Sequence, residues 1–387
     1  MTSELSDRAP ATAGPGPLAG IRVVELAGIG PGPFAAMLLA DLGADVVRVD
    51  RPGGPGLGID PARDVTNRNK RSVLIDLKAA DGADTVLGLA ERADILIEGY
   101  RPGVAERLGV GPDACLARNP RLVYGRITGW GQDGPLAATA GHDIGYIAVT
   151  GALALSGRQG PPSAPANLLG DYAGGSLYLV TGVLAALHHA REHRSGQVVD
   201  AAVVDGTAHL TAMIHGMRAA GAWQDRRGAN LLDGGAPFYG VYETADGGHM
   251  AVGALEQRFY DEFAALLGLS GPEAALRADP ARWETLRTAV AARFRTRTRD
   301  EWTGVFTGTD ACVAPVLSLA EAPGHPQLSA RGTFTEDAGT VQPAPAPRFS
   351  ATPAALRRPP APPGAHTADV AADWDVPALL GRPGPRA

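Results

Sequence analysis

The chain has 387 residues, of which 45% are hydrophobic and 20% charged, and its formal net charge is −6. This length allows a large core and two domains; the negative charge argues against a general nucleic-acid binder, and no apolar run reaches the ~20 residues of a membrane span. Only two cysteines are present, Cys115 and Cys312, which excludes a disulfide framework or a zinc motif and fits a reducing cytoplasm.

The N-terminal part of the chain alternates strand-like and helix-like segments. A Gly/Pro loop, 28–33, follows the first strand. The alternation predicts β-α-β units and therefore a parallel, doubly wound sheet of the α/β class. Strands are expected at 22–26, 45–50, 73–75, 94–98 and 122–127, and helices at 34–42 and 81–92.

The pattern becomes helical from residue 143 to 194, with Gly-rich breaks, and includes an apolar small-residue helix at 173–190. Beyond residue 223 the sequence predicts a smaller α+β domain that begins with a hairpin, whose turn is Ala-Asp-Gly-Gly at 245–248. The remaining expected elements are a strand at 198–200, a helix at 201–220, hairpin strands at 238–244 and 249–253, helices at 257–267, 282–294 and 300–306, and a strand at 312–317.

These segments suggest five parts of the chain. Residues 1–16 are expected to form a loose tail, and residues 17–200 a large domain. A linker helix and crossing segment, 201–236, then leads to a small domain at 237–325. The Pro-rich remainder, 326–387, is predicted to return to the large domain and end in a tail.

Several common motifs are incomplete or missing. The loop after the first strand has Gly28 and Gly30 of a dinucleotide fingerprint, and Asp50 ends the second strand, but Pro33 occupies the third glycine position. This argues against a nicotinamide cofactor. The sequence has no P-loop motif, no G-x-S-x-G elbow and no clustered metal-ligand spacing.

Basic residues gather where the predicted strands end. The only two lysines, Lys70 and Lys78, lie in one basic stretch, 67–78. Loops at strand ends line the ligand crevice of an open α/β sheet, and several cations there would suit a ligand with multiple phosphates. The alternative is a solvated charged surface. The cations concerned are Arg51, Arg68, Lys70, Arg71 and Arg101.

Three residues are candidates for acid–base chemistry. His142 offers an imidazole in a loop, between a glycine and an acid. Asp171 precedes an apolar helix, so it is either an N-cap or a catalytic carboxylate, and the two roles are compatible. Glu256 begins a helix, where the helix dipole also favours an acid. A base and a carboxylate facing one ligand provide proton removal and return at one carbon.

In several segments the sequence resembles the α-methylacyl-CoA racemases, in particular their bacterial members, within the family III CoA-transferase (CaiB/BaiF) superfamily. The resemblance runs from about residue 17 to about residue 347. It is carried by VVEL at 23–26, LADLGA at 39–44, VDRPG at 49–53, KRS at 70–72, GHDI at 141–144, NLLGD at 167–171, GQVVD at 196–200, LDGGAPFY at 232–239 and DAC at 310–312.

The resemblance implies an interlocked homodimer in which each subunit has a Rossmann-like large domain and a small domain. It implies that His142 and Asp171 are the acid/base pair, that Glu256 of the other subunit partners the histidine, and that Arg107 lies in the active-site region. The substrate would be an acyl-CoA thioester, with no metal, no cofactor beyond the CoA moiety, and no nucleic-acid or membrane partner. The implied CoA contacts are Arg51, Ile75, Asp76, Leu77, Lys78, Arg101, Gly141, Asp143, Ile144, Gly145 and Tyr146, the family commonly having Asn at the position of Gly145.

The expected reaction interconverts (2R)- and (2S)-2-methylacyl-CoA by 1,1-proton transfer through an enolate. His142 would serve one face of the α-carbon and Asp171 the other, so the pKa of Asp171 must be raised by desolvation. Backbone N–H groups at the start of the Asp171 helix could hold the enolate oxygen. The alternatives are a CoA-transferase that uses Asp171 as nucleophile and a non-enzymatic CoA-ester binding protein.

Overall fold

The structure is a computed structural model that describes residues 15–54 and 58–381. Residues 1–14 of the expected tail lie outside this description. The chain divides into two compact units: a large unit of Met1–Thr150, Pro165–Leu210 and Ala330–Ala387, and a small unit of Gly151–Ala164 and Thr211–Ser329.

The predicted large domain, 17–200, differs from the large unit at one excursion of the chain. Residues 151–164 belong to the small unit, where Arg158 forms an ion pair with Glu284. Arg227 of the same unit donates hydrogen bonds to the carbonyl groups of Ser156 and Gly160. The sequence between 201 and 236 is shared: its first ten residues stay with the large unit and the rest belong to the small unit.

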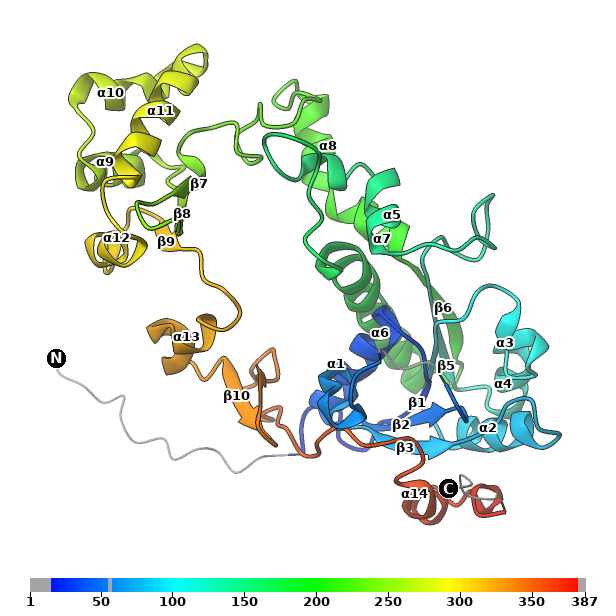
Figure 1. Ribbon diagram of the computed structural model, residues 1–387. Coiled ribbons are helices and arrows are strands. Elements are labelled where there is room, and N and C mark those ends of the chain that lie inside the picture. Colours follow the sequence, from blue (N-terminus) through cyan, green and yellow to red (C-terminus); the bar gives the residue numbers. More distant parts are fainter. Residues whose placement is uncertain (1–14, 55–57, 382–387) are drawn as a thin grey trace. The chain divides into compact units, whose positions relative to one another are not determined.

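A six-stranded parallel sheet forms the centre of the large unit (Figure 1). Its strand order, β3-β2-β1-β4-β5-β6, is the doubly wound order in which the chain reverses direction across the sheet between β1 and β4. This confirms the predicted fold class. The strands are β1 (Arg22–Leu26), β2 (Asp45–Asp50), β3 (Arg71–Leu74), β4 (Ile95–Glu98), β5 (Val123–Thr128) and β6 (Gln197–Ala202).

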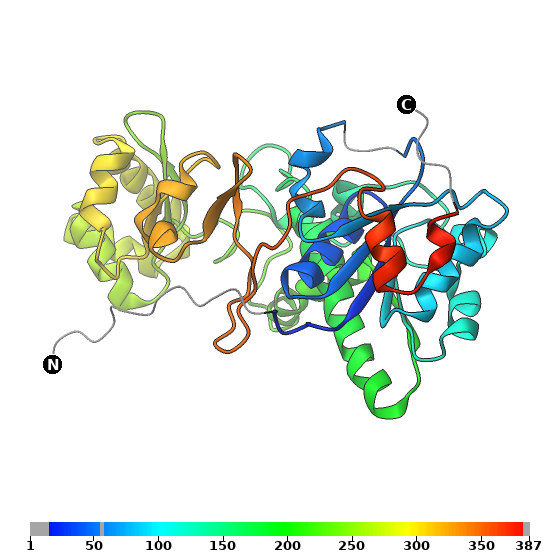
Figure 2. The ribbon, with the colours of Figure 1, turned by 90° about the horizontal axis from the view of Figure 1, so that it is seen from below.

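Helices cover both faces of this sheet, which is why its inner strands are apolar on both sides. Helices α1 and α6 pack on one face, against Val23, Val46 and Ile95. Helices α2, α4 and α14 pack on the other face (Figure 2). Trp374, which follows α14, is fully buried there. The bounds are α1 (Pro31–Asp41), α2 (Gly82–Glu91), α3 (Val104–Arg107), α4 (Pro112–Arg118), α6 (Leu177–His193) and α14 (Thr367–Asp373).

Three helical segments follow β5 and β6 and contact one another: α5 (Asp143–Val149), the π-helix η4 (Leu168–Ser176) and α7 (Val203–Leu210). Segment η4 continues directly into α6. Together, Leu168–His193 is the one helix in the described chain that is long and apolar enough to cross a membrane, by length and composition only. Because α6 packs on β5 and β6 with Leu179 and Val183 fully buried, it is a core helix of the large unit.

The small unit is α+β, as predicted. Strands β7 (Tyr239–Glu243) and β8 (His249–Gly253) form the expected hairpin, and β9 (Val313–Pro315) pairs antiparallel to β8. An aromatic core of Phe263, Phe294 and Trp302 joins the sheet to α9 (Gln257–Leu267), α11 (Trp283–Phe294) and α12 (Arg299–Phe306). The predicted helix 201–220 is broken into α7 and α8 (Ala212–Ala219).

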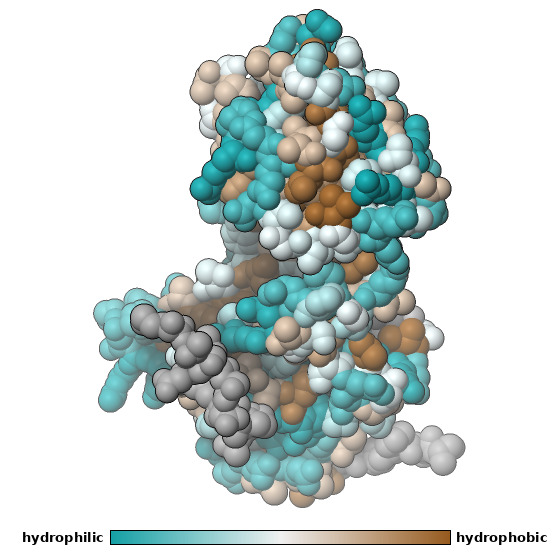
Figure 3. Space-filling model, turned by 90° about the vertical axis from the view of Figure 1, so that its left-hand side faces the viewer, coloured by the Kyte–Doolittle hydropathy of each residue, from teal (hydrophilic) through white to brown (hydrophobic). Residues whose placement is uncertain are grey.

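The remaining elements are short. The hairpin of β10 (Phe334–Asp337) and β11 (Thr340–Pro343) belongs to the large unit, while α10 (Gly271–Ala275) belongs to the small unit and α13 (Pro326–Ala330) lies where the chain leaves it. Single 3-10 turns occur at Pro61–Arg63, Val65–Asn67, Leu153–Leu155, Leu276–Ala278, Pro280–Arg282, Ala322–Gly324 and Pro377–Leu379. Apolar side chains also reach the molecular surface in several places (Figure 3).

Three cations that the sequence suggested for phosphate binding are instead buried in ion pairs of the large unit. Lys70 Nζ lies 2.7 Å from Glu25 Oε2, and both side chains are excluded from solvent. Arg68 pairs with Asp41, and Arg71 with Asp45 and Asp373. Buried and paired, these groups are not free for a ligand, so that part of the sequence interpretation is wrong.

The Lys70 pair joins three segments of the large unit. Glu25 lies on β1, Lys70 precedes β3, and the same ammonium group donates a hydrogen bond of 3.0 Å to the carbonyl of Pro33 in α1. Removing one partner of a buried pair leaves an uncompensated charge, whereas replacing both by apolar groups is often close to neutral.

We predict that Lys70→Met lowers the free energy of unfolding by about 3–5 kcal/mol, because Glu25 is left buried and unpaired. The double variant Glu25→Leu/Lys70→Met should recover most of that loss. Urea unfolding of the two variants and the unchanged protein measures both quantities. A loss below about 1 kcal/mol in the single variant, the size of a surface pair, would contradict the prediction.

Candidate active site

A cavity of about 350 Å³ opens in the large unit at the carboxyl ends of β1, β4 and β5. This is the position at which ligands bind in open parallel sheets. The Gly/Pro loop after β1 forms one wall, and the loops after β4 and β5 form others. Both predicted acid/base residues, His142 and Asp171, line this one cavity, although 28 residues separate them in the chain.

His142 stands at the boundary between loop and helix. Its backbone is extended and caps α5, and its carbonyl accepts hydrogen bonds from the N–H groups of Gly145 and Tyr146. The imidazole is exposed, and within the described chain it forms no hydrogen bond. The ring of Tyr146 lies so close to Gly141 that a Cβ there would be 2.5 Å from it, so only glycine fits at residue 141. The approach of the chain to His142 is therefore fixed by packing.

Asp171 lies inside the π-helix η4, and not at its N-cap, which is Asn167. The predicted capping role is thus wrong. Its backbone N–H donates a hydrogen bond of 2.6 Å to Asp143 Oδ1. That N–H is therefore not available to an enolate oxygen. The carboxylate itself faces the cavity next to Gly30, where a Cβ would come within 3.2 Å of Oδ2.

The pKa of Asp171 is raised to about 6: burial is the main cause and the neighbouring charge of Asp143 adds to it, while a hydrogen bond from Asn167 and the charge of His142 partly oppose the shift. The shift has the direction that proton return by this carboxyl requires. A group with a pKa close to neutrality exchanges protons readily in both directions near pH 7.

Of the other predicted ligand contacts, some line the cavity and others do not. Arg101, Gly141 and Tyr146 line the cavity. Asp143, Ile144 and Gly145 belong to α5 but do not line it: Asp143 is buried beneath η4 and Ile144 is exposed.

The predicted contacts at the ends of β2, β3 and β4 have different surroundings. Ile75 is buried in the core of the large unit, so its side chain does not face a ligand. Arg51 and Lys78 are exposed cations in the segments that follow β2 and β3, and Arg107 is an exposed cation at the end of α3, which follows β4. Of the two remaining predicted contacts, Asp76 is exposed and Leu77 is half-buried.

Glu256 belongs to the small unit. It is the exposed N-cap residue of α9, and its carbonyl accepts the N–H of Tyr260. The sequence placed Glu256 in the first turn of this helix, whereas the structure places it at the N-cap, one residue before α9 begins.

Two aromatic residues that line the cavity, Tyr100 and Trp130, are not among the site residues predicted from the sequence. They follow β4 and β5 directly, and the predicted strands at 94–98 and 122–127 already placed them at the ligand-binding edge of the sheet. The indole of Trp130 packs edge-on against Tyr146 with ring centroids 4.8 Å apart. Trp130 and Tyr146 thus form one continuous aromatic wall of the cavity.

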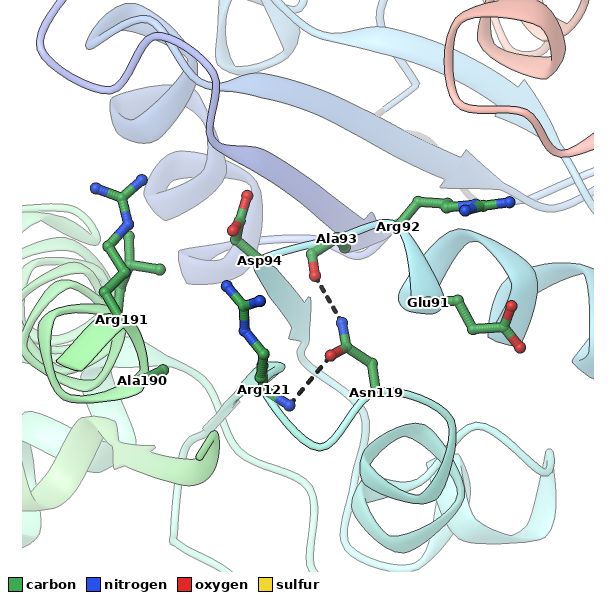
Figure 4. Close-up of a pocket in the computed structure, with 9 residues that line it drawn as sticks. Glu91, Arg92, Ala93, Asp94, Asn119, Arg121, Ala190 and Arg191 are labelled. Atoms are coloured by element: carbon green, nitrogen blue, oxygen red, sulfur yellow. Dashed lines mark hydrogen bonds between the residues drawn. The ribbon is translucent and has the colours of Figure 1, made fainter. Parts of the chain in front are cut away.

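A second, smaller cavity of about 210 Å³ lies at the opposite edge of the sheet, before β4 (Figure 4). Its groups are mainly structural: Asn119 donates hydrogen bonds to the carbonyls of Ala90 and Ala93, and Asp94 accepts the N–H of Arg22. In the described residues, no group of three or more His, Cys, Asp or Glu side chains is placed to hold a metal ion.

The sequence of residues 18–367 matches the protein-family model for CoA-transferase family III. The chain belongs to this family. It is 46% identical over 339 residues to the human "Alpha-methylacyl-CoA racemase", with 87% of each chain covered. To the mouse protein of that name it is 43% identical over 361 residues, covering 92% of this chain and 93% of the relative.

Other members of the family are also similar. A "Succinyl-CoA--L-malate CoA-transferase beta subunit" from Chloroflexus aurantiacus is 33% identical over 384 residues, with 92% of this chain and 93% of the relative covered. A crystal structure of a CaiB/BaiF family protein from Brucella suis superposes with a TM-score of 0.81 at 27% identity, covering 93% of this chain and all of that one.

The raised pKa of Asp171 predicts a pH-dependent contribution to stability. The folded state holds this proton more tightly than the unfolded chain, whose value is 3.8, so the contribution is fully present below pH 3.8 and is lost as the pH rises through about 6. Relative to Asp171→Asn, the unchanged protein should therefore lose stability between pH 4 and pH 6.5. Urea unfolding of both proteins across this range measures the difference, and a difference that does not vary with pH would contradict the assignment.

Proposed function

We propose that this family III protein is an α-methylacyl-CoA racemase that interconverts (2R)- and (2S)-2-methylacyl-CoA. The observation that carries the proposal is that His142 and a carboxyl whose pKa is about 6, Asp171, line the same cavity. The identities of 43% and 46% to proteins named as this racemase support the same reaction.

The proposed chemistry needs only these two side chains. The carbon next to a thioester carbonyl is a weak acid, so one group must remove its proton while the other returns a proton to the opposite face. His142 removes the proton of one epimer, and neutral Asp171 protonates the enolate; in the reverse direction the roles exchange. We expect no metal and no cofactor beyond the CoA moiety of the substrate.

The phosphates of CoA are proposed to bind exposed cations in the segments that follow β2, β3 and β4. Arg51, Lys78, Arg101 and Arg107 are the members of this group that the structure leaves exposed. Guanidinium and ammonium groups at such positions suit a ligand with several phosphates. The buried Arg68, Lys70 and Arg71 are not part of this site.

We propose that the active form is a homodimer in which Glu256 of one copy supports His142 of the other. The imidazole of His142 is exposed on its own chain, so a side chain of a second copy could reach it and orient it. Large apolar side chains are exposed on α5, η4 and α6 beside the site, as at an interface between chains. They are Ile144, Val149, Leu168 and Leu177.

The unpaired thiols of Cys115 and Cys312 agree with the expected cytoplasmic location.

The second candidate is CoA transfer between carboxylic acids with Asp171 as nucleophile. It is favoured by the 33% identity to a CoA-transferase subunit and by the exposure of the same carboxylate to the cavity. A transferase forms a covalent thioester on the aspartate and leaves the α-proton in place.

We predict that the protein incorporates deuterium at C2 of (2R)-2-methylacyl-CoA in deuterated water and returns both epimers. His142→Ala and Asp171→Asn should each slow inversion by about 10²–10⁴-fold, the usual contribution of a positioned acid or base. Mass spectrometry and chiral separation of the thioesters measure exchange and inversion. CoA transfer to a free acid without exchange at C2 would instead establish the transferase.

A further inference from the structure

We propose that Asp143 is a positioning residue that holds Asp171 in place relative to His142. The proposal rests on the racemase function given above and adds a residue that acts on both proton-transfer groups without touching the substrate. Asp143 does not line the cavity, and the resemblance assigned it only to CoA contacts.

Asp143 is connected to both groups through the backbone. It follows His142 directly and begins α5. Its Oδ1 accepts the backbone N–H of Asp171 at 2.6 Å, across 28 residues of chain. Because an ionised acceptor makes a short and strong bond, this contact fixes the first turn of α5 to the middle of η4. This hydrogen bond is thus one of the contacts between α5 and η4 that set the separation of the two cavity-lining residues.

The burial of Asp143 indicates a functional role. The residue is only 6% exposed, and its second oxygen, Oδ2, has no hydrogen-bond partner in the described part of the chain. A buried carboxylate with one unpaired oxygen costs free energy that an uncharged residue would not. The neighbouring backbone is adapted to it as well, since a Cβ on Gly170 would lie 2.5 Å from Oδ1.

The charge of Asp143 also acts on the carboxyl of Asp171. The titratable and charged groups that face Asp171 are Asp143, His142 and Tyr146 on the α5 side; Asn167 of η4 adds a hydrogen bond, and the loop after β1 contributes only Gly30. Of these, Asp143 raises the pKa of Asp171 and His142 lowers it. Asp143 thus favours the protonated form that returns a proton.

The test compares Asp143→Asn, which keeps an acceptor oxygen but not the charge, with Asp143→Ala, which keeps neither. Each is incubated with each epimer in deuterated water, and deuterium is measured separately in the recovered epimer and in the inverted product. We expect Asp143→Ala to slow inversion by about 100-fold, the usual effect of displacing a reacting group by about 1 Å. We expect Asp143→Asn to stay within about tenfold of the unchanged protein.

The two epimers should respond differently. The epimer whose proton His142 removes should still exchange with retention in Asp143→Ala, because only the return by Asp171 is impaired. The epimer whose proton Asp171 removes should lose exchange and inversion together. In Asp143→Asn, the pH midpoint of that second reaction should move to lower pH, since a like charge has been removed.

Asp94→Ala is the matched structural control. Asp94 also accepts a backbone N–H of the large unit, that of Arg22 at 2.9 Å, but at the opposite edge of the sheet (Figure 4). It should lower stability and leave the ratio of exchange to inversion and the pH midpoint unchanged.

Three results would overturn the positioning role: inversion by Asp143→Ala within threefold of the unchanged protein, equal losses of deuterium exchange for both epimers, or Asp143→Asn as slow as Asp143→Ala. If Asp143→Ala does not fold, Asp143→Asn decides alone, and an unmoved pH midpoint rejects the proposal. If the unchanged protein exchanges neither epimer, the racemase function itself is rejected, and the role of Asp143 with it.

Discussion

The site depends on a direct backbone contact between η4 and α7. A Cβ on Gly206 would lie 1.8 Å from the carbonyl oxygen of Gly174, and a Cβ on Gly174 would lie 2.3 Å from Thr207 Oγ1. Only glycine at both positions lets the two segments approach this closely. The buried hydroxyl of Ser176 adds a contact to the start of α1, since it donates a hydrogen bond of 2.7 Å to the carbonyl of Pro31. These contacts bring η4, and Asp171 with it, over the carboxyl ends of the parallel strands.

The same packing explains the electrostatics of the site. A segment pressed between α5, α7 and α1 excludes water from the side chain that it carries, so the pKa of Asp171 rises mainly by burial. The π-helical backbone of η4 contributes as well. Its wider turn places Asp171 within the helix, where the backbone N–H meets a side chain of α5 in place of the substrate. Such turns occur often at functional sites.

The elements that the sequence predicts well are those with a local signal. Alternating apolar strands and Gly-stopped helices predict β1, α1 and β2 within a few residues, and the turn at 245–248 predicts the hairpin of the small unit. His142 and Asp171 were found by their residue types and by family resemblance, and the structure adds that they share one cavity.

The predictions that are wrong concern residues whose role depends on partners distant in the chain. Nothing near Lys70 indicates that Glu25, 45 positions earlier, would bury it in an ion pair. Likewise, Arg68 and Arg71 look like a phosphate site until Asp41 and Asp45 are placed beside them. The π-helix has no periodicity that distinguishes it from an ordinary helix start, so the sequence predicts a cap at Asp171. In each case a tertiary contact decides the role of the residue.

The raised pKa of Asp171 bears differently on the two candidate reactions. A nucleophile for CoA transfer needs only the ionised form, which a carboxyl of ordinary pKa supplies almost completely at pH 7. An epimerase that works in both directions needs the same carboxyl in both forms. With a pKa of about 6, about one tenth of the molecules carry the proton at pH 7. The raised pKa therefore leaves about nine tenths of the carboxyl ionised for either reaction, and in addition it supplies the protonated form that a residue returning a proton needs.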